Sequence, residues 1–203
     1  MLEAYPEPIM TEYQSESPSD IDVEGNRRAR KYSAWVLLAR VAWRSCHPLF
    51  YWSPRPLWGW RRMVLRAFGA RIGKGVHIYP TVRITMPWHL TIGADAAVGD
   101  QAILYALGKI TLGARVTISQ GAHLCAGTHD IADPARRLLK PPITIGSDAW
   151  ICADAFVGPD VTIGAGAIIG ARAVAMKEVP ARVVAAGNPA RIIRPAQSKD
   201  RAQ

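Results

Sequence analysis

Residues 145–174 read IGSDAW, ICADAF, VGPDVT, IGAGAI and IGARAV when they are divided into sixes. A period of six fits neither the 3.6-residue period of a helix nor the two-residue period of a strand with one buried face. It is the hexapeptide signature of a parallel β-helix, in which three short strands make one triangular coil of about 18 residues. We therefore expect the aliphatic residue that opens each block to point into the core; these residues are Ile145, Ile151, Val157, Ile163 and Ile169.

The same pattern extends toward the N-terminus, so the predicted β-helix covers residues 71–180. Blocks in phase run from Ile72, and the phase shifts by two residues at Ile92 and again at Leu112. We interpret each shift as a longer corner between strands and not as an end of the repeat. A longer interruption, THDIADPARRLLKPP at residues 128–142, predicts an inserted loop. A loop of this length inside a compact repeat is usually functional.

The segments on either side of the repeat differ from it in composition. Residues 1–30 open with seven acidic residues and no Lys or Arg before position 27, together with several prolines and serines. This composition favours a disordered acidic tail. At the other end, residues 181–203 follow the point where the sixes fade, and they are predicted to form a C-terminal extension and tail.

Residues 31–70 are rich in Trp and Arg and predict a helical cap. We expect two helices, at residues 33–46 and 57–68, separated by a proline-containing turn. A β-helix needs its open end covered, which favours packing of these helices on the first coil. A Trp- and Arg-rich helix lying on a membrane surface is the alternative. We keep peripheral membrane contact through residues 31–68 as an additional expectation, because the apolar run is too short to span a bilayer.

Charge and cysteine content indicate a compartment but no partner. The formal net charge is +9, yet basicity alone is weak evidence for nucleic-acid binding, and we expect no nucleic-acid partner. The first residues are acidic and lack the apolar run of a secretory signal. Cys46, Cys125 and Cys152 show no metal-type spacing and do not form an even set for disulfides. The expected location is the cytoplasm, either free or at the inner face of the membrane.

His129 is the candidate catalytic residue, because it stands where the repeat gives way to the inserted loop. A neutral imidazole with a pKa near 6.5 can accept a proton from a hydroxyl group at neutral pH. Such a base suits the direct transfer of an acyl group from a thioester to an alcohol when both substrates are held together. A lone histidine is more often structural than catalytic, so the position at the loop junction carries this hypothesis.

The sequence resembles the hexapeptide-repeat acyltransferases, and within them the colanic acid biosynthesis acetyltransferase type. The segments that carry the resemblance are LRAFGARIGKGVHIYPTVRI, ILYALGKITLG, LCAGTHD and AAGNPARIIR, and the similarity covers about residues 57–195. The resemblance implies a left-handed parallel β-helix, a homotrimer and acetyl-CoA as co-substrate. It also implies the roles of single residues. His129 matches the general base, Trp150, Ala153 and Ala171 match positions along the pantetheine arm, and Lys177, Arg191 and Arg194 match basic positions near the CoA phosphates.

One departure from the family concerns the acceptor. Gly99 stands where the galactoside and maltose acetyltransferases have an Asn that helps to hold the acceptor. We therefore expect a different acceptor, with Asp100, Tyr105 and Asp130 as candidate contacts. The resulting expectation is an O-acetyltransferase that acts on a saccharide hydroxyl, from an exopolysaccharide or lipid-linked sugar precursor, without a metal.

Two other functions stay open at this stage. The first is a zinc hydratase of the γ-carbonic anhydrase kind, which needs three convergent histidine ligands. His89, His123 and His129 are the only trio to consider, and their spacing does not match that family well. The second is a non-catalytic scaffold built on a β-helix. Retention of His129, Trp150 and Lys177 together argues against the scaffold.

Overall fold

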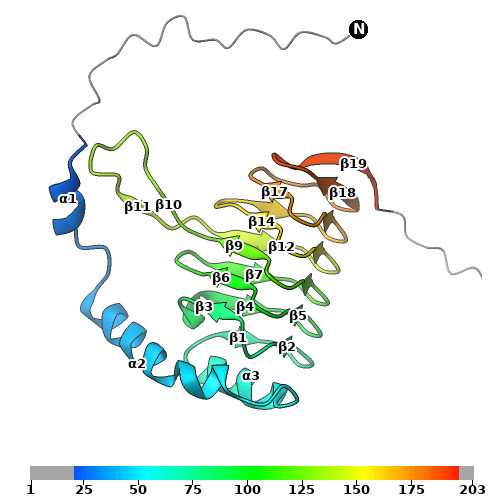
Figure 1. The fold of residues 1–203 in the computed structure, drawn as a ribbon, viewed down its shortest axis with the longest axis horizontal. Coiled ribbons are helices and arrows are strands. Elements are labelled where there is room, and N and C mark those ends of the chain that lie inside the picture. The colour runs from blue at the N-terminus through cyan, green and yellow to red at the C-terminus, as the bar shows by residue number, and fades with distance from the viewer. Residues whose placement is uncertain (1–20, 197–203) are drawn as a thin grey trace, which may run out of the picture.

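Three sheets form the walls of a parallel β-helix in the computed structural model, which describes residues 21–196 (Figure 1). The predicted tails at residues 1–20 and 197–203 lie outside the described residues. Wall A contains β1 (Arg71–Ile72), β4 (Leu90–Ile92), β7 (Ile110–Leu112), β12 (Ile143–Ile145) and β15 (Thr162–Ile163). Wall B contains β2 (His77–Ile78), β5 (Ala97–Val98), β8 (Thr117–Ile118), β13 (Trp150–Ile151), β16 (Ile168–Ile169), β18 (Val183–Ala186) and β19 (Arg191–Pro195). Wall C contains β3 (Arg83–Ile84), β6 (Ile103–Tyr105), β9 (His123–Cys125), β14 (Phe156–Val157) and β17 (Val174–Ala175).

The core of the β-helix consists of the aliphatic residues that open the blocks. Ile145 is 1% exposed, and Ile151, Val157, Ile163 and Ile169 are completely buried, as the period of six predicts. Each such side chain contributes about 1.5–3 kcal/mol through removal from water. Because parallel strands in register place these residues one above another, the same column of contacts continues from coil to coil. The stacking of these residues in the core therefore accounts for the period of six in the sequence.

The predicted phase shifts lie at one corner of the prism. Ile72 pairs with Ile92 and Ile92 pairs with Leu112, so the first two coils each take twenty residues, whereas Ile145 and Ile163 are eighteen apart. The additional residues follow β3 and β6, on the way from wall C to wall A, where the first coil also forms the short helix η1 (Pro87–His89). We name this edge the C–A corner. The inserted loop leaves from the same corner, after β9 and before β12. The interpretation of the shifts as longer corners is confirmed.

Two helices cover the first coil at the N-terminal end. Helix α2 (Ala34–Tyr51) is capped by Ser33, whose hydroxyl accepts from the backbone N–H of Val36. Helix α3 (Trp58–Ala67) packs against β1, β2 and η1. Trp43 of α2 is buried and donates its indole N–H to the carbonyl of Ile84 at 2.8 Å. This cap occupies the lower end of the β-helix in Figure 1.

Helix α2 extends beyond its predicted end at Cys46 and contains Pro48. Proline removes one backbone hydrogen bond and normally ends a helix. Here Trp43 and Phe50, one on each side of Pro48, are both buried in the core and hold the two halves on the same surface. Pro48 itself is exposed, so water can reach the carbonyl that loses its partner.

A short helix, α1 (Val23–Arg28), lies in the segment that the composition assigned to a disordered tail. Asp22 caps it, with a carboxylate oxygen that accepts from the N–H of Gly25 at 2.6 Å. The helix contacts the inserted loop, more than a hundred residues away in the sequence. The described part of residues 1–30 therefore differs from the prediction. Its hydrogen-bond partners lie far away in the sequence, and the composition of the segment cannot indicate such partners.

Candidate active site

The inserted loop is a β-hairpin that projects from the C–A corner. Strand β10 (Thr128–His129) pairs antiparallel with β11 (Leu138–Leu139), so that His129 is opposite Leu138. Figure 1 shows the hairpin beside α1, away from the stacked coils. The backbone N–H of Asp130 continues the ladder by donating to the carbonyl of Arg137 at 2.9 Å. His129 thus lies at the end of a paired strand, just before the tip of the hairpin.

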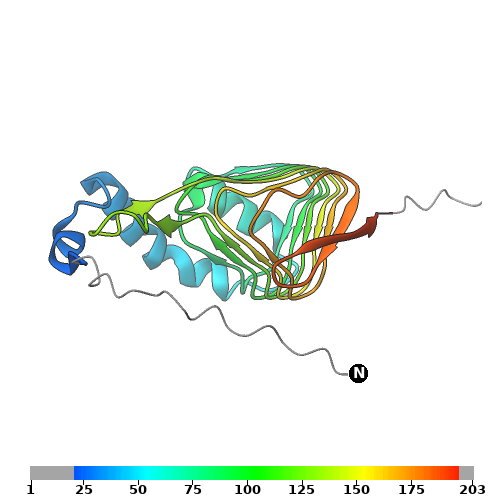
Figure 2. The same ribbon diagram turned by 90° about the horizontal axis from the view of Figure 1, so that it is seen from above.

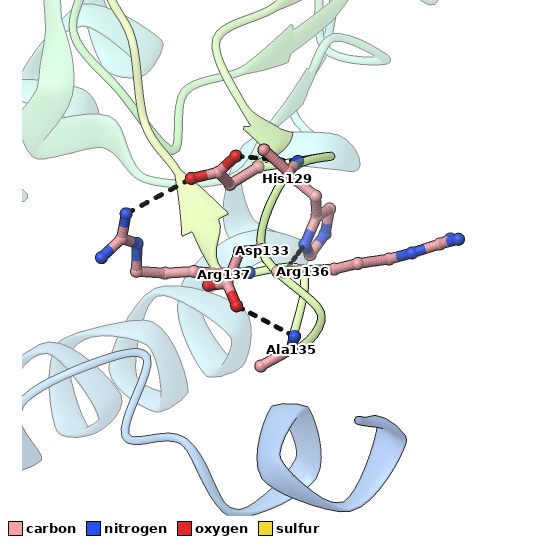
Figure 3. Close-up of polar contacts among 7 residues, drawn as sticks. His129, Asp133, Ala135, Arg136 and Arg137 are labelled. Carbon is pink, nitrogen blue, oxygen red and sulfur yellow. Dashed lines mark hydrogen bonds and ion pairs between the residues drawn. The ribbon is translucent and has the colours of Figure 1, made fainter. Parts of the chain in front are cut away.

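One backbone contact sets the state of the His129 ring. Its Nδ1 lies 2.6 Å from the carbonyl oxygen of Arg136, on the opposite side of the hairpin (Figure 3). A carbonyl oxygen can only accept, so Nδ1 carries the hydrogen, and in the neutral ring Nε2 keeps its lone pair. The side chain is exposed. This arrangement gives an oriented, accessible base, which is what removal of a proton from a substrate hydroxyl requires.

Asp130 follows His129 in the sequence but does not orient its ring. Its carboxylate accepts from Arg137 Nη2 at 3.3 Å and from the backbone N–H of Ala132 at 3.1 Å. Asp133 stabilises the tip by accepting from the N–H groups of Ala135 and Arg137 (Figure 3). Both aspartates therefore shape the hairpin.

His129 borders a pocket of about 420 Å³ between the hairpin and α1. Its lining contains both apolar and polar side chains, which suits a ligand with both hydroxyl groups and carbon faces. The lining residues are Ile21, Asp22, Val23, Asn26, Arg27, His129, Ile131, Pro134, Ala135 and Arg136. The N-terminal segment supplies half of them, and sequence reasoning assigned no function to that segment.

Residues expected along the pantetheine arm lie on wall B and at its border with wall C. The indole of Trp150, in β13, is 47% exposed and donates to the hydroxyl of Ser119 at 2.8 Å, which fixes the ring. Ala153 and Ala171 occupy equivalent positions on successive coils, since the N–H of Arg172 donates to the carbonyl of Ala153 at 2.9 Å. Two small residues stacked beside a fixed indole leave room for a linear chain along the coils. Ser119 was not anticipated.

The expected phosphate-binding residues fall into two groups. Arg191 and Arg194 lie on β19, the outermost strand of wall B, and both are exposed. Lys177 follows β17 and is exposed at the C–A corner, two coils beyond the hairpin. In a three-walled prism the C–A corner is the edge opposite wall B, and Figure 2 shows the hairpin and β19 at opposite ends of the view. Within one chain, His129 therefore lies on the opposite side of the β-helix from Trp150, Arg191 and Arg194.

The candidate acceptor residues are also divided. Tyr105 ends β6 beside the C–A corner, with its ring edge-on to that of His123. Asp130 is in the hairpin next to His129. Asp100 lies at the corner between walls B and C, where its carboxylate accepts from the hydroxyl of Thr81. Tyr105 and Asp130 are on the same side of the chain as His129, and Asp100 is on the other.

The remaining histidines have separate surroundings. His89 has its Nδ1 2.9 Å from the carbonyl of Ala106. His123 packs edge-on against Phe156, and its Nε2 is buried without a hydrogen-bond partner in the described structure. Between residues 21 and 196, no three His, Cys, Asp or Glu side chains gather at one point. The trio considered for zinc therefore does not converge within the described part of one chain.

Comparison with known proteins decides the family. A family model described as bacterial transferase hexapeptide (six repeats) matches residues 142–174. The chain is 50% identical over 159 residues to the acetyltransferase WcaF of Escherichia coli (strain K12), which is named for colanic acid biosynthesis. The aligned region covers 78% of this chain and 87% of that relative. The chain belongs to the hexapeptide-repeat acetyltransferase family.

Solved structures of hexapeptide-repeat acetyltransferases share the fold. A galactoside acetyltransferase in complex with coenzyme A matches with a TM-score of 0.77 at 25% identity, over 84% of this chain and 87% of that chain. An acetyltransferase from Vibrio cholerae O1 biovar eltor, complexed with acetyl coenzyme A, matches with a TM-score of 0.76 at 22% identity, over 83% and 93% of the two chains. The expected fold, a left-handed parallel β-helix with helices at its N-terminal end, is confirmed.

Proposed function

We propose that this hexapeptide-repeat acetyltransferase transfers an acetyl group from acetyl-CoA to a hydroxyl of a saccharide. The observation that carries the proposal is the contact between His129 Nδ1 and the carbonyl of Arg136, which leaves Nε2 free as a base. In this scheme Nε2 accepts the hydroxyl proton while the oxygen attacks the thioester carbonyl. The carbon–oxygen bond forms, the carbon–sulfur bond breaks, and the proton passes from His129 to the departing thiolate of CoA.

The relatives support the donor and the acceptor class of this proposal. The two matched structures hold coenzyme A or acetyl coenzyme A, and the exposed Trp150, Arg191 and Arg194 offer this chain an indole and two guanidinium groups for the same ligand. One relative acts on a galactoside and the other is named for an exopolysaccharide. A saccharide of an exopolysaccharide or lipid-linked precursor is the acceptor that fits both, with Tyr105 and Asp130 as contacts near His129.

The first experiment measures CoA release from acetyl-CoA with a panel of free, nucleotide-linked and lipid-linked sugars. His129→Ala should lose roughly 10²- to 10⁴-fold in rate with the productive acceptor. His77→Asn is the matched control, because His77 is an exposed histidine on wall B of the first coil. If no acceptor stimulates CoA release by the wild-type protein, the transferase proposal is wrong. If His129→Ala is fully active, His129 is not the base.

We also propose a homotrimer whose active sites lie between subunits. His129 and Trp150 are on opposite sides of one chain, so one acetyl-CoA meets both only if a second copy supplies one of them. Light scattering should give three times the chain mass of 22.1 kDa. Mixed trimers of His129→Ala and Trp150→Ala, formed by joint refolding, should regain part of the activity that neither variant has alone. Mixtures no more active than their components would place both residues in one subunit's site.

The helical cap is proposed to rest on an anionic membrane face in the cytoplasm. Residues 25–94 hold thirteen Lys or Arg and no Asp or Glu, and Trp35 on α2 and Trp52, which directly follows α2, are each 79% exposed. Exposed indoles beside basic residues favour the interface of an anionic bilayer. No helix within residues 21–196 has the length and apolar character needed to cross a bilayer.

Vesicle sedimentation tests this contact. Vesicles containing phosphatidylglycerol should pellet the protein, and pure phosphatidylcholine vesicles or high salt should not. Trp35→Ser/Trp52→Ser should abolish pelleting, whereas Ile193→Ser, at an exposed apolar site on β19, should leave it unchanged. Equal pelleting of both variants would contradict the assignment to α2.

A further inference from the structure

Helix α1 and the hairpin are joined by several hydrogen bonds. The backbone N–H of Asp22 donates to the carbonyl of Pro134 at 3.0 Å, and Lys140 donates its ammonium to the carbonyl of Lys31 at 2.9 Å. The same ammonium lies 4.2 Å from the centre of the Tyr32 ring. These contacts fasten the N-terminal segment along the loop that carries His129.

Asn26 makes the central contacts of this junction. Its amide Nδ2 donates to the carbonyl of Ala135 at 2.5 Å and to that of Arg136 at 3.1 Å. Its Oδ1 accepts from the ammonium of Lys31 at 2.8 Å. The orientation of the amide is determined by these partners, because two carbonyls can only accept and an ammonium can only donate. A flipped amide would oppose all three contacts.

The carbonyl of Arg136 therefore has two donors. Asn26 approaches it from α1, and His129 Nδ1 approaches it from β10. The two lone pairs of a carbonyl oxygen allow both bonds. Arg136 has a φ of +46°, in the left-handed region that a residue with a Cβ seldom adopts without support from its surroundings. Asn26 supplies such support, because its two hydrogen bonds hold the peptide groups on either side of the Arg136 α-carbon.

We propose that Asn26 is a positioning residue for His129. By fixing the Arg136 carbonyl, it keeps the hydrogen of the imidazole on Nδ1 and the lone pair on Nε2. The consequence for catalysis rests on the proposed function, in which Nε2 is the base. The consequence for the ring does not, because the tautomer is a property of the protein without substrates.

The experiment compares Asn26→Leu, which keeps the size of the side chain and removes its donor, with wild type. Nitrogen-15 spectra of the imidazole are recorded at a pH well above the usual histidine pKa of about 6.5. Wild type should show His129 protonated at Nδ1 alone, and Asn26→Leu should show a mixture of both tautomers. In the acetyl-transfer assay, kcat should fall roughly 10- to 100-fold with the KM for acetyl-CoA unchanged.

Two further variants separate positioning from general loosening of the loop. Asn26→Gln retains the amide donor on a longer side chain and should recover part of kcat and of the wild-type spectrum. Lys140→Ala breaks a different contact between the same segments without touching the Arg136 carbonyl, and its spectrum should stay that of wild type. An unchanged His129 spectrum in Asn26→Leu would overturn the proposal, as would the same tautomer mixture in Lys140→Ala. A wild type with the expected spectrum but no activity would count against the transferase alone.

Discussion

Arg61 shows how one residue ties the cap to the β-helix. It is completely buried, and its guanidinium donates to the carbonyls of Ile78, Pro54 and Arg55 and to the hydroxyl of Ser53. Burial lowers the pKa of Arg61, but the usual value is so high that the group remains charged. The planar fork thus bonds the second strand of the first coil and the turn between α2 and α3 at once.

Replacement of this fork should destabilise the junction. Arg61→Met would leave several buried acceptors without a donor, and the expected loss in unfolding free energy is about 3 kcal/mol. Arg61→Lys should recover little, because a single ammonium cannot reach the same set of acceptors. Urea unfolding at one fixed protein concentration measures both. Arg71→Met, at an exposed position on β1, is the control and should stay within about 0.5 kcal/mol of wild type.

His123 should make stability depend on pH. Burial, and next the charge of Arg83, lower the pKa of His123 below the value of a solvated histidine. The unfolded chain therefore binds a proton at a higher pH than the folded chain, so stability falls as the pH drops through about 6.5 and below. The melting temperature of wild type should decrease more steeply from pH 7.5 to 5.5 than that of His123→Phe. Parallel pH profiles would contradict this assignment.

At the scale of elements, the hairpin depends on a close approach at its base. An added Cβ on Gly108 would lie 2.4 Å from the carbonyl oxygen of Pro141 and 2.5 Å from that of Lys140, closer than real contacts allow. Gly108 thus lies in the lengthened corner directly beneath residues 140–141, which follow β11. The insertion is packed onto the coil before it, and does not merely extend from it.

Gly108→Ala should therefore displace the residues that follow β11. The expected cost is about 1–3 kcal/mol in unfolding free energy, because the obstructing atoms belong to the backbone. Transfer activity should fall as well, since β11 pairs with the strand that carries His129. Gly59→Ala is the control: its nearest neighbour is the end of Arg62 at 3.9 Å, and alanine in a helix should be neutral or stabilising. Equal behaviour of the two variants would show that the corner yields freely.

Much of the element order could be predicted from the sequence, because inward residues at a period of six specify coils locally. Ile72, Ile92 and Leu112 revealed even the two-residue extensions, since any other register would expose them. The end of α2 could not be predicted, because burial of Phe50 against the first coil outweighs the local effect of Pro48. Helix α1 was missed for the same reason, as its partners are at residues 134–136.

The candidate site was predicted only in part. His129 could be singled out because a loop junction is visible in the sequence. The group that orients its ring could not, because it is the backbone carbonyl of Arg136, and a carbonyl leaves no signature in residue types. Asn26 is an ordinary amide in an acidic segment until the fold brings it to the hairpin. Asp130 suggested a partner for His129 by adjacency, yet its carboxylate bonds Arg137.

As a whole molecule, the chain is a stack in which each coil contacts mainly its neighbours. Strands in adjacent coils lie about 4.8 Å apart, so position along the axis is counted in coils. The hairpin leaves the third coil, whereas Arg191 and Arg194 lie on the strand that closes the other end. The number of coils between the hairpin and β19 therefore sets the distance along the axis between the proposed base and the proposed phosphate contacts.

This spacing can be changed without altering the core. Insertion of a second copy of residues 145–162 after Thr162 adds one eighteen-residue coil in phase, so the protein should fold with a melting temperature near that of wild type. The insertion moves Arg191 and Arg194 about 4.8 Å farther from the hairpin. The KM for acetyl-CoA should rise severalfold, which initial-rate kinetics would detect. An unchanged KM would show that these arginines do not contact the nucleotide.

The C–A corner has a consequence for how such enzymes diversify. Every irregular length in the described repeat is accommodated at this one edge, while the strands before and after it stay in register. A loop added there can grow, shorten or change sequence without any demand on the buried aliphatic columns. Variation in the loop that carries His129 is thereby uncoupled from foldability. A lineage can alter this loop while walls A, B and C, and the surface proposed to hold CoA, are inherited intact.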